Sequence, residues 1–194
     1  MKKLIFLVVL IAVLTGNIIA QEKPNEGIKP ALLVIDIQNK FLPMMDVREK
    51  EFAFYFINAY IAGFRSAGLP IIRIYHSDAA EGPFPGTPEF EFPSEIAITP
   101  DDPQIIKTYP NSFNKTDLEK ILKDKGVNTL FLCGLSSVGC VLATYMGAHD
   151  HDFKVFMLKD AIMSHNSDYT DQIENIFSAI NYDAVEVMLM NVEK

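Results

Sequence analysis

The chain has 194 residues, of which 49% are hydrophobic and 22% are charged, and its formal net charge is −8 at pH 7. This length and composition predict one globular domain with a substantial core. The excess of acidic over basic residues, with no cluster of basic ones, argues against a nucleic-acid-binding protein.

The N-terminus has the three parts of a secretory signal peptide, residues 1–20. Two lysines give a positive start, the block from Leu4 to Leu14 is apolar, and cleavage is predicted after Ala20. The block is shorter than the roughly 20 residues that span a bilayer, and an uncleaved anchor is the alternative. Cleavage removes two of the 17 basic residues and leaves 15 against 25 acidic ones. We therefore expect an exported protein, periplasmic or extracellular, that has one domain over residues 21–194 and no stable membrane insertion.

Short apolar runs alternate along the chain with segments of helical period. Strands are predicted at residues 31–36, 70–76, 128–133, 154–158 and 184–189, with a further short one ending at Lys107. Helices are predicted at 49–66, 116–125, 139–150 and 168–180. This alternation predicts an α/β fold, a three-layer αβα domain with a mainly parallel six-stranded sheet. Ligands bind beyond the carboxyl ends of the strands in such a sheet.

The segment from Ser77 to Pro103 departs from this alternation, since it contains six prolines and no helical or strand period. Long irregular loops in compact domains are usually functional or mobile. We interpret this one, which follows a strand's carboxyl end, as a lid or pocket wall. A plain surface insertion is the alternative.

Two charged residues stand at predicted strand ends. Asp36 ends an apolar run, where desolvation would raise its pKa and suit it to proton transfer, although a turn or helix-capping role is the alternative. Lys107 follows a short apolar pair and, taken alone, is interpreted as a solvated lysine.

The chain has two cysteines, Cys133 and Cys140. Cys133 ends a strand run and is predicted to be buried and inert. Cys140 follows a turn rich in glycine and serine and opens a helix, whose positive end would stabilise a thiolate; a small core residue is the alternative. A disulfide between them is disfavoured, because a strand end and the following helix need not bring the two Cβ atoms together.

Three segments, in order, carry a resemblance to a known superfamily. They are "LLVIDIQNKF", "KTYPNSFNKTDLEKIL" and "LFLCGLSSVGCVLATYMGAHDHDFKVFMLKDA". With them the chain resembles the isochorismatase-like cysteine hydrolases, which include nicotinamidases and N-carbamoylsarcosine amidases. The resemblance implies a catalytic triad of Asp36, Lys107 and Cys140. In this superfamily the cysteine attacks a carbonyl carbon, the aspartate transfers the proton and the lysine stabilises the charged pair.

The resemblance also implies an oxyanion hole made by the backbone N–H groups of Ser136 and Cys140. It is associated with a cis peptide bond between Leu135 and Ser136.

The chain departs from nicotinamidases at their metal-binding motif. Those enzymes carry Asp-x-His with a further histidine, whereas this chain reads His76-Ser77-Asp78 and has no histidine directly after it. The remaining histidines, at positions 149, 151 and 165, are interpreted as solvated. We therefore expect no metal site and no cofactor.

These observations predict a hydrolase that cleaves a C–N bond of a small amide or carbamoyl compound through a cysteine thioester. The alternatives are hydrolysis of a vinyl ether of the isochorismate type, without a covalent intermediate, and a catalytically silent binding protein. The expected partner is a small-molecule substrate, and the resemblance implies a homo-oligomer. Candidate pocket residues are Phe41, His76, Tyr109 and Phe113, for which packing in the core is the alternative.

Overall fold

The computed structural model describes residues 27–192, so the predicted leader and its cleavage site lie outside the described residues. Within this range, no helix combines the length and the apolar character that crossing a membrane requires.

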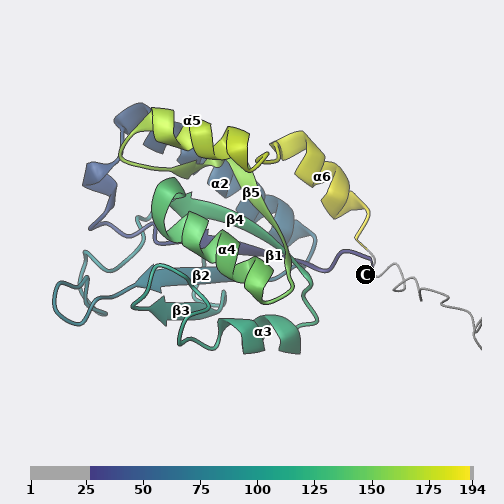
Figure 1. Cartoon of the computed structure of the whole chain (residues 1–194), viewed down its shortest axis with the longest axis horizontal. Helices are drawn as coiled ribbons and strands as arrows, with labels where there is room; N and C mark the ends of the chain where they lie inside the picture. The colour runs from purple at the N-terminus through teal and green to yellow at the C-terminus, as the bar shows by residue number, and fades with distance from the viewer. Residues whose placement is uncertain (1–26, 193–194) are drawn as a thin grey trace, which may run out of the picture.

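A parallel sheet of five strands forms the centre of the described domain, in the order β3-β2-β1-β4-β5 (Figure 1). The strands are β1 (Pro30–Ile35), β2 (Ile71–His76), β3 (Gln104–Lys107), β4 (Thr129–Leu135) and β5 (Lys154–Met163). The helices are α2 (Val47–Ser66), α3 (Leu118–Asp124), α4 (Leu142–Asp150), α5 (Ser167–Ile176) and α6 (Tyr182–Met190). A 3-10 turn, η1 (Leu42–Met44), and a π-helical turn, η2 (Ser137–Val141), complete the described elements.

The inner strands β1, β2 and β4 are buried on both faces, because alternate side chains of one strand enter two separate cores. Leu32 and Val34 of β1 join the core under α2 and α6, whereas Leu33 and Ile35 join the core under α3 and α4. Figure 1 shows α4 in front of the sheet and α2 behind it. This confirms the predicted three-layer α/β domain.

The predicted last strand, residues 184–189, is wrong, since this segment lies within helix α6. Asn181 caps the helix by accepting a hydrogen bond from the backbone N–H of Ala184. Val185 is buried, and Tyr182 and Leu189 pack against the core under α2. The apolar residues of this segment are spaced in a way that fits one face of a helix as well as one face of a strand. The sheet therefore has five strands rather than the six predicted.

The loop at residues 77–103 packs on the sheet rather than over the site. Phe90 and Phe92 are buried, and their rings stack on Tyr75 of β2 at 4.8 and 4.4 Å. None of its residues lines the cavity described below. The interpretation of this loop as a pocket wall is therefore wrong: its aromatic side chains close the core beside α2.

Gly134 brings β4 against β1 directly before the site. Its φ is +112°, and a Cβ atom there would lie 2.1 Å from the backbone oxygen of Ile35. Only glycine allows this approach, which places the residues after β1 and β4 side by side.

Candidate active site

Asp36 directly follows β1 and is buried. Its φ is +52°, in the left-handed region that Asp adopts more readily than most residues. The backbone N–H donates to the oxygen of Ile74 at 2.9 Å, which anchors Asp36 to β2. The carboxylate oxygen Oδ2 accepts a hydrogen bond from Lys107 Nζ at 2.7 Å, while Oδ1 is buried without a partner among the described residues.

Lys107 ends β3, and its side chain reaches across the sheet ends to three polar groups. Its Nζ lies 2.7 Å from Asp36 Oδ2, 3.3 Å from Cys140 Sγ and 3.4 Å from His76 Nδ1. Lys107 is 1% exposed, so these contacts take all three N–H bonds of a buried ammonium group. The interpretation of Lys107 as a solvated lysine is wrong.

Cys140 lies in η2, directly before α4, and is half-buried. The turn is kinked at Gly139, whose φ and ψ are −126° and −108°. Turns of this type are frequent at functional sites. The sequence placed Cys140 in the first turn of the helix, whereas α4 begins at Leu142.

Two polar contacts hold the three strand ends in place. The buried side chain of Gln38 donates to the backbone oxygen of His76 at 3.0 Å and accepts from its N–H at 2.7 Å. On the other side, the hydroxyls of Ser112 and Thr144 lie 2.8 Å apart and tie the segment after β3 to α4. Gln38 therefore anchors the backbone of His76, and the Ser112–Thr144 contact joins the segment that follows Lys107 to the helix that follows Cys140.

Burial governs the protonation states of the site. It raises the pKa of Asp36 above its ordinary value, although Lys107 acts in the opposite direction. Burial, together with the negative charge of Asp36, raises the pKa of the Cys140 thiol to about 12. The expectation that the helix end stabilises a thiolate is therefore not met in the resting site, where burial and the charge of Asp36 favour the neutral thiol.

Burial and the adjacent Lys107 lower the pKa of His76, so its imidazole is neutral near pH 7. Its Nδ1 accepts from Lys107, which leaves the proton of the neutral ring on Nε2.

A cavity of about 450 Å³ opens beside these groups, within the range of about 300 to 1,000 Å³ typical of ligand pockets. Its polar lining residues are Asp36, His76, Ser136, Cys140 and His165. Its apolar lining residues are Phe41, Met44, Met45, Pro110 and Leu135. Of the four pocket residues predicted from the sequence, Phe41 and His76 line the cavity. No pattern in the sequence points to His165 or the two methionines, because the segments that carry them meet the site only in the fold.

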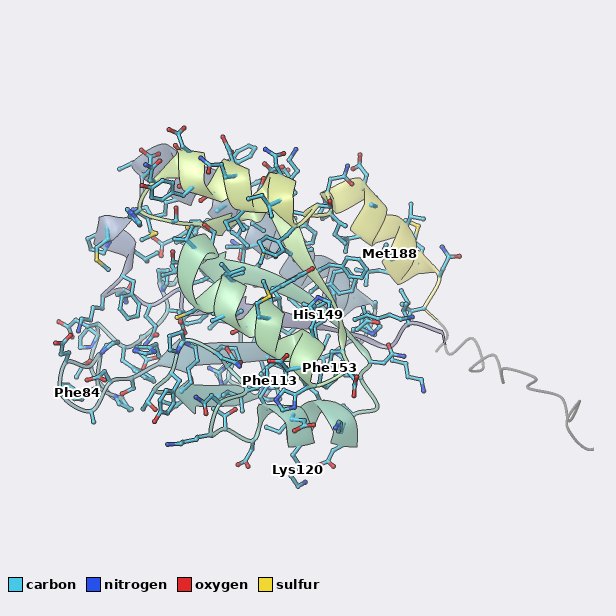
Figure 2. The ribbon with its side chains drawn as sticks, viewed as in Figure 1. Phe84, Phe113, Lys120, His149, Phe153 and Met188 are labelled. Atoms are coloured by element: carbon cyan, nitrogen blue, oxygen red, sulfur yellow. The ribbon has the colours of Figure 1, made fainter. Side chains whose placement is uncertain are left out.

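Phe113 and Tyr109 lie elsewhere. Phe113 is buried in the core, with its ring stacked on those of His151 and Phe153 beside α3 (Figure 2). Tyr109 is 37% exposed, and its hydroxyl accepts from Lys115. Neither lines the cavity, so the packing alternative holds for Phe113.

The two cysteines are both free, and Cys133 is fully buried in the core under α2. Burial raises the pKa of Cys133 far above its ordinary range, which makes it an inert packing residue. The peptide bond between Leu135 and Ser136 is cis, as the resemblance implies.

Asp36, His76 and Cys140 place one potential metal ligand each within 4.8 Å of one another. Lys107 Nζ contacts all three of these groups. A divalent cation among them would stand beside a buried positive charge, so this donor set fits the ammonium group better than a metal ion.

A parallel α/β domain with a cysteine, a carboxylate and a lysine gathered at its strand ends is typical of hydrolytic enzymes. The isochorismatase-domain family model matches residues 30–184, and the chain belongs to the isochorismatase family of hydrolases. The uncharacterized isochorismatase family protein YddQ of Bacillus subtilis is 32% identical over 148 residues, which cover 74% of this chain and 82% of YddQ.

Two solved structures of amidases share this fold. N-carbamoylsarcosine amidase from Thermoplasma acidophilum is 25% identical, with a TM-score of 0.69 over 79% of this chain and 95% of that one. Pyrazinamidase of Pyrococcus horikoshii, in complex with zinc, is 27% identical, with a TM-score of 0.68 over 77% of this chain and 94% of that one.

Proposed function

We propose that the protein is an exported, metal-independent cysteine hydrolase that cleaves a C–N bond of a small amide or carbamoyl compound. The observation that carries the proposal is the buried ammonium group of Lys107, in contact with both Asp36 and Cys140 at the wall of the cavity. The amidase relatives support the choice of a C–N bond.

In the proposed first half-reaction, the thiol proton of Cys140 passes to Oδ1 of Asp36, the carboxylate oxygen that has no hydrogen-bond partner among the described residues. Sγ then attacks the carbonyl carbon, and the resulting oxyanion is bound by the backbone N–H groups of Ser136 and Cys140. As the C–N bond breaks, Asp36 gives the proton to the departing nitrogen. Ammonia or an amine leaves, and a thioester remains on Cys140.

In the second half-reaction, water attacks the thioester and transfers a proton to Asp36. The C–S bond breaks, the acid product leaves, and Asp36 returns the proton to Sγ of Cys140. Lys107 keeps its charge throughout. It stabilises whichever of Asp36 and Cys140 is anionic, so that proton transfer between them needs no exchange with solvent.

The test is ammonia release from a panel of small amides and carbamoyl compounds. We expect Cys140→Ala to reduce turnover by at least about 10⁴-fold, because nucleophile and base act as a unit. Cys133→Ala, which changes the other cysteine, should keep near wild-type turnover. A slow substrate should leave an acyl adduct on Cys140 in mass spectrometry. Ammonia release that survives Cys140→Ala would contradict the thioester route.

The proposal that turnover requires no metal ion has its own test. Dialysis against a chelator should leave turnover of the active amide unchanged, and a loss that Zn²⁺ restores would contradict it.

Export is proposed on the N-terminal pattern alone. Expression of the full chain in a bacterium that exports through signal peptides should yield a secreted or periplasmic protein that begins at Gln21. An intact N-terminus in the membrane fraction would indicate a retained anchor instead.

A further inference from the structure

The charge and lining of the cavity restrict what the proposed hydrolase can accept, and this inference rests on the proposed function. We propose that its substrates are uncharged amides with a small apolar body, and that amides carrying a carboxylate are excluded. Five of the ten lining residues are apolar: Phe41, Met44, Met45, Pro110 and Leu135. A substrate body in this space contacts ring edges, thioethers and aliphatic carbon.

The ammonium group in contact with the reacting side chains is already committed, and that of Lys40, whose charge also acts on His76, donates to the backbone oxygen of Glu81. Lys107 is 1% exposed, and its three N–H bonds face Asp36 Oδ2, Cys140 Sγ and His76 Nδ1. Among the residues whose side chains the structure describes, no arginine or lysine lines the cavity. A carboxylate on the substrate would therefore lose its hydration without gaining a cationic partner among these lining residues, and it would face the negative charge of Asp36.

His165 is the one further ionisable group of the lining. It is exposed, and its ring meets the ring of Tyr169 edge-on at 5.4 Å.

The first test compares two amides of nearly equal shape, 4-methylpentanamide and succinamate, in which an isopropyl group and a carboxylate occupy the same place. We expect kcat/KM for 4-methylpentanamide to exceed that for succinamate by at least about 100-fold at pH 8. Equal values, or a preference for succinamate, would overturn the inference.

The second test is independent of amide hydrolysis. Neutral iodoacetamide and anionic iodoacetate both alkylate a thiol, with loss of iodide, and mass mapping separates Cys140 from the buried Cys133. We expect the ratio of the iodoacetamide rate to the iodoacetate rate at Cys140 to exceed the same ratio for free glutathione by at least about tenfold. A ratio at or below that of glutathione would overturn the inference, as would failure of both reagents to reach Cys140.

A matched pair of variants tests the cause. Met44 is 56% exposed at the rim, so a charged side chain is accommodated there. Met44→Arg should reduce both preference ratios at least tenfold, because it supplies the missing cation, whereas Met44→Leu should keep them. Unchanged ratios in Met44→Arg would contradict the electrostatic explanation.

The two proposals fail in different ways. If Cys140→Ala still hydrolyses amides, the proposed function fails, but the alkylation ratio still reports on the cavity. If turnover depends on Cys140 and succinamate is the better substrate, only the inference about substrate charge fails.

Discussion

The hydroxyls of Ser112 and Thr144 lie 2.8 Å apart in a fully buried contact between the segment after β3 and helix α4. Thr144 Oγ1 also accepts a hydrogen bond from the backbone N–H of Ser112 at 3.1 Å. Lys107 precedes Ser112 on one side of this contact, and Cys140 lies about one helical turn before Thr144 on the other. The pair therefore ties the segment that follows Lys107 to the helix that follows Cys140.

Thr144→Val should weaken both the fold and the site. Valine has the shape of threonine but leaves the N–H and hydroxyl of Ser112 buried without their partner, at a cost of about 1 to 3 kcal/mol in the free energy of unfolding. We expect kcat/KM to fall about tenfold, because Lys107 is displaced. Enzyme kinetics measure this loss, and urea denaturation of the same variant measures the loss of stability. Thr87→Val, in the exposed loop, is the control, and equal losses in the two variants would contradict this role.

Gly134→Ala should disrupt the junction of β1 and β4. The new Cβ would lie 2.1 Å from a backbone oxygen at a φ of +112°, and neither strand can move without losing sheet pairing. We expect a loss of more than about 3 kcal/mol, or insoluble protein. Gly126→Ala also has a positive φ but meets nothing within 4 Å, so it should cost about 1 kcal/mol. Comparable denaturation midpoints for the two variants would contradict this explanation.

Turnover should fall in acid because Asp36 must be ionised to accept the thiol proton. Its pKa is raised by burial, so kcat/KM should decline as pH falls through a midpoint above 3.8, the ordinary value for Asp. A pH–rate profile from 4 to 8 measures this. Because the pKa of His76 is lowered, the acid limb should persist in His76→Asn. Loss of the limb in that variant would assign it to the histidine.

Glu174 should make the fold less stable as pH rises. It is buried on α5, Oε1 accepts from the backbone N–H of Asp160 at 2.7 Å, and burial raises its pKa from 4.5 to about 7. The folded state thus binds a proton that the unfolded state releases, and the stability present below pH 4.5 is lost as pH rises to about 7.

Glu174→Gln keeps the acceptor without the charge. It should therefore be more stable than the wild type at pH 8, by up to about 3 kcal/mol, and close to it at pH 4.5. Urea denaturation at the two pH values measures the difference. Glu51→Gln, on the exposed side of α2, is the control, and a gain independent of pH would contradict the assignment.

Local pattern was sufficient for most of the fold. Apolar strand runs that alternate with segments of helical period predict a parallel sheet with helices on both faces, and the bounds agree within a few residues for β1, β2, β4 and α2. The pattern failed at residues 184–189, where the spacing of the apolar residues fits both a strand and a helix. Packing against α2 and the cap at Asn181 favour the helix. The pattern also predicts a loop at residues 77–103, but it does not predict that two aromatic rings of this loop are buried against Tyr75.

The sequence by itself determined the α/β class, and the resemblance carried by its three ordered segments implied that Asp36, Lys107 and Cys140 form a set. Only the tertiary structure decided their state: a buried ammonium group in contact with a carboxylate, a neutral imidazole and a thiol whose pKa is raised rather than lowered. It also decided the lining of the cavity, to which Met44, Pro110 and His165 come from separate loops. The physical reason is that period and propensity act between neighbours in the chain, whereas desolvation and charge pairing depend on groups that meet only after folding.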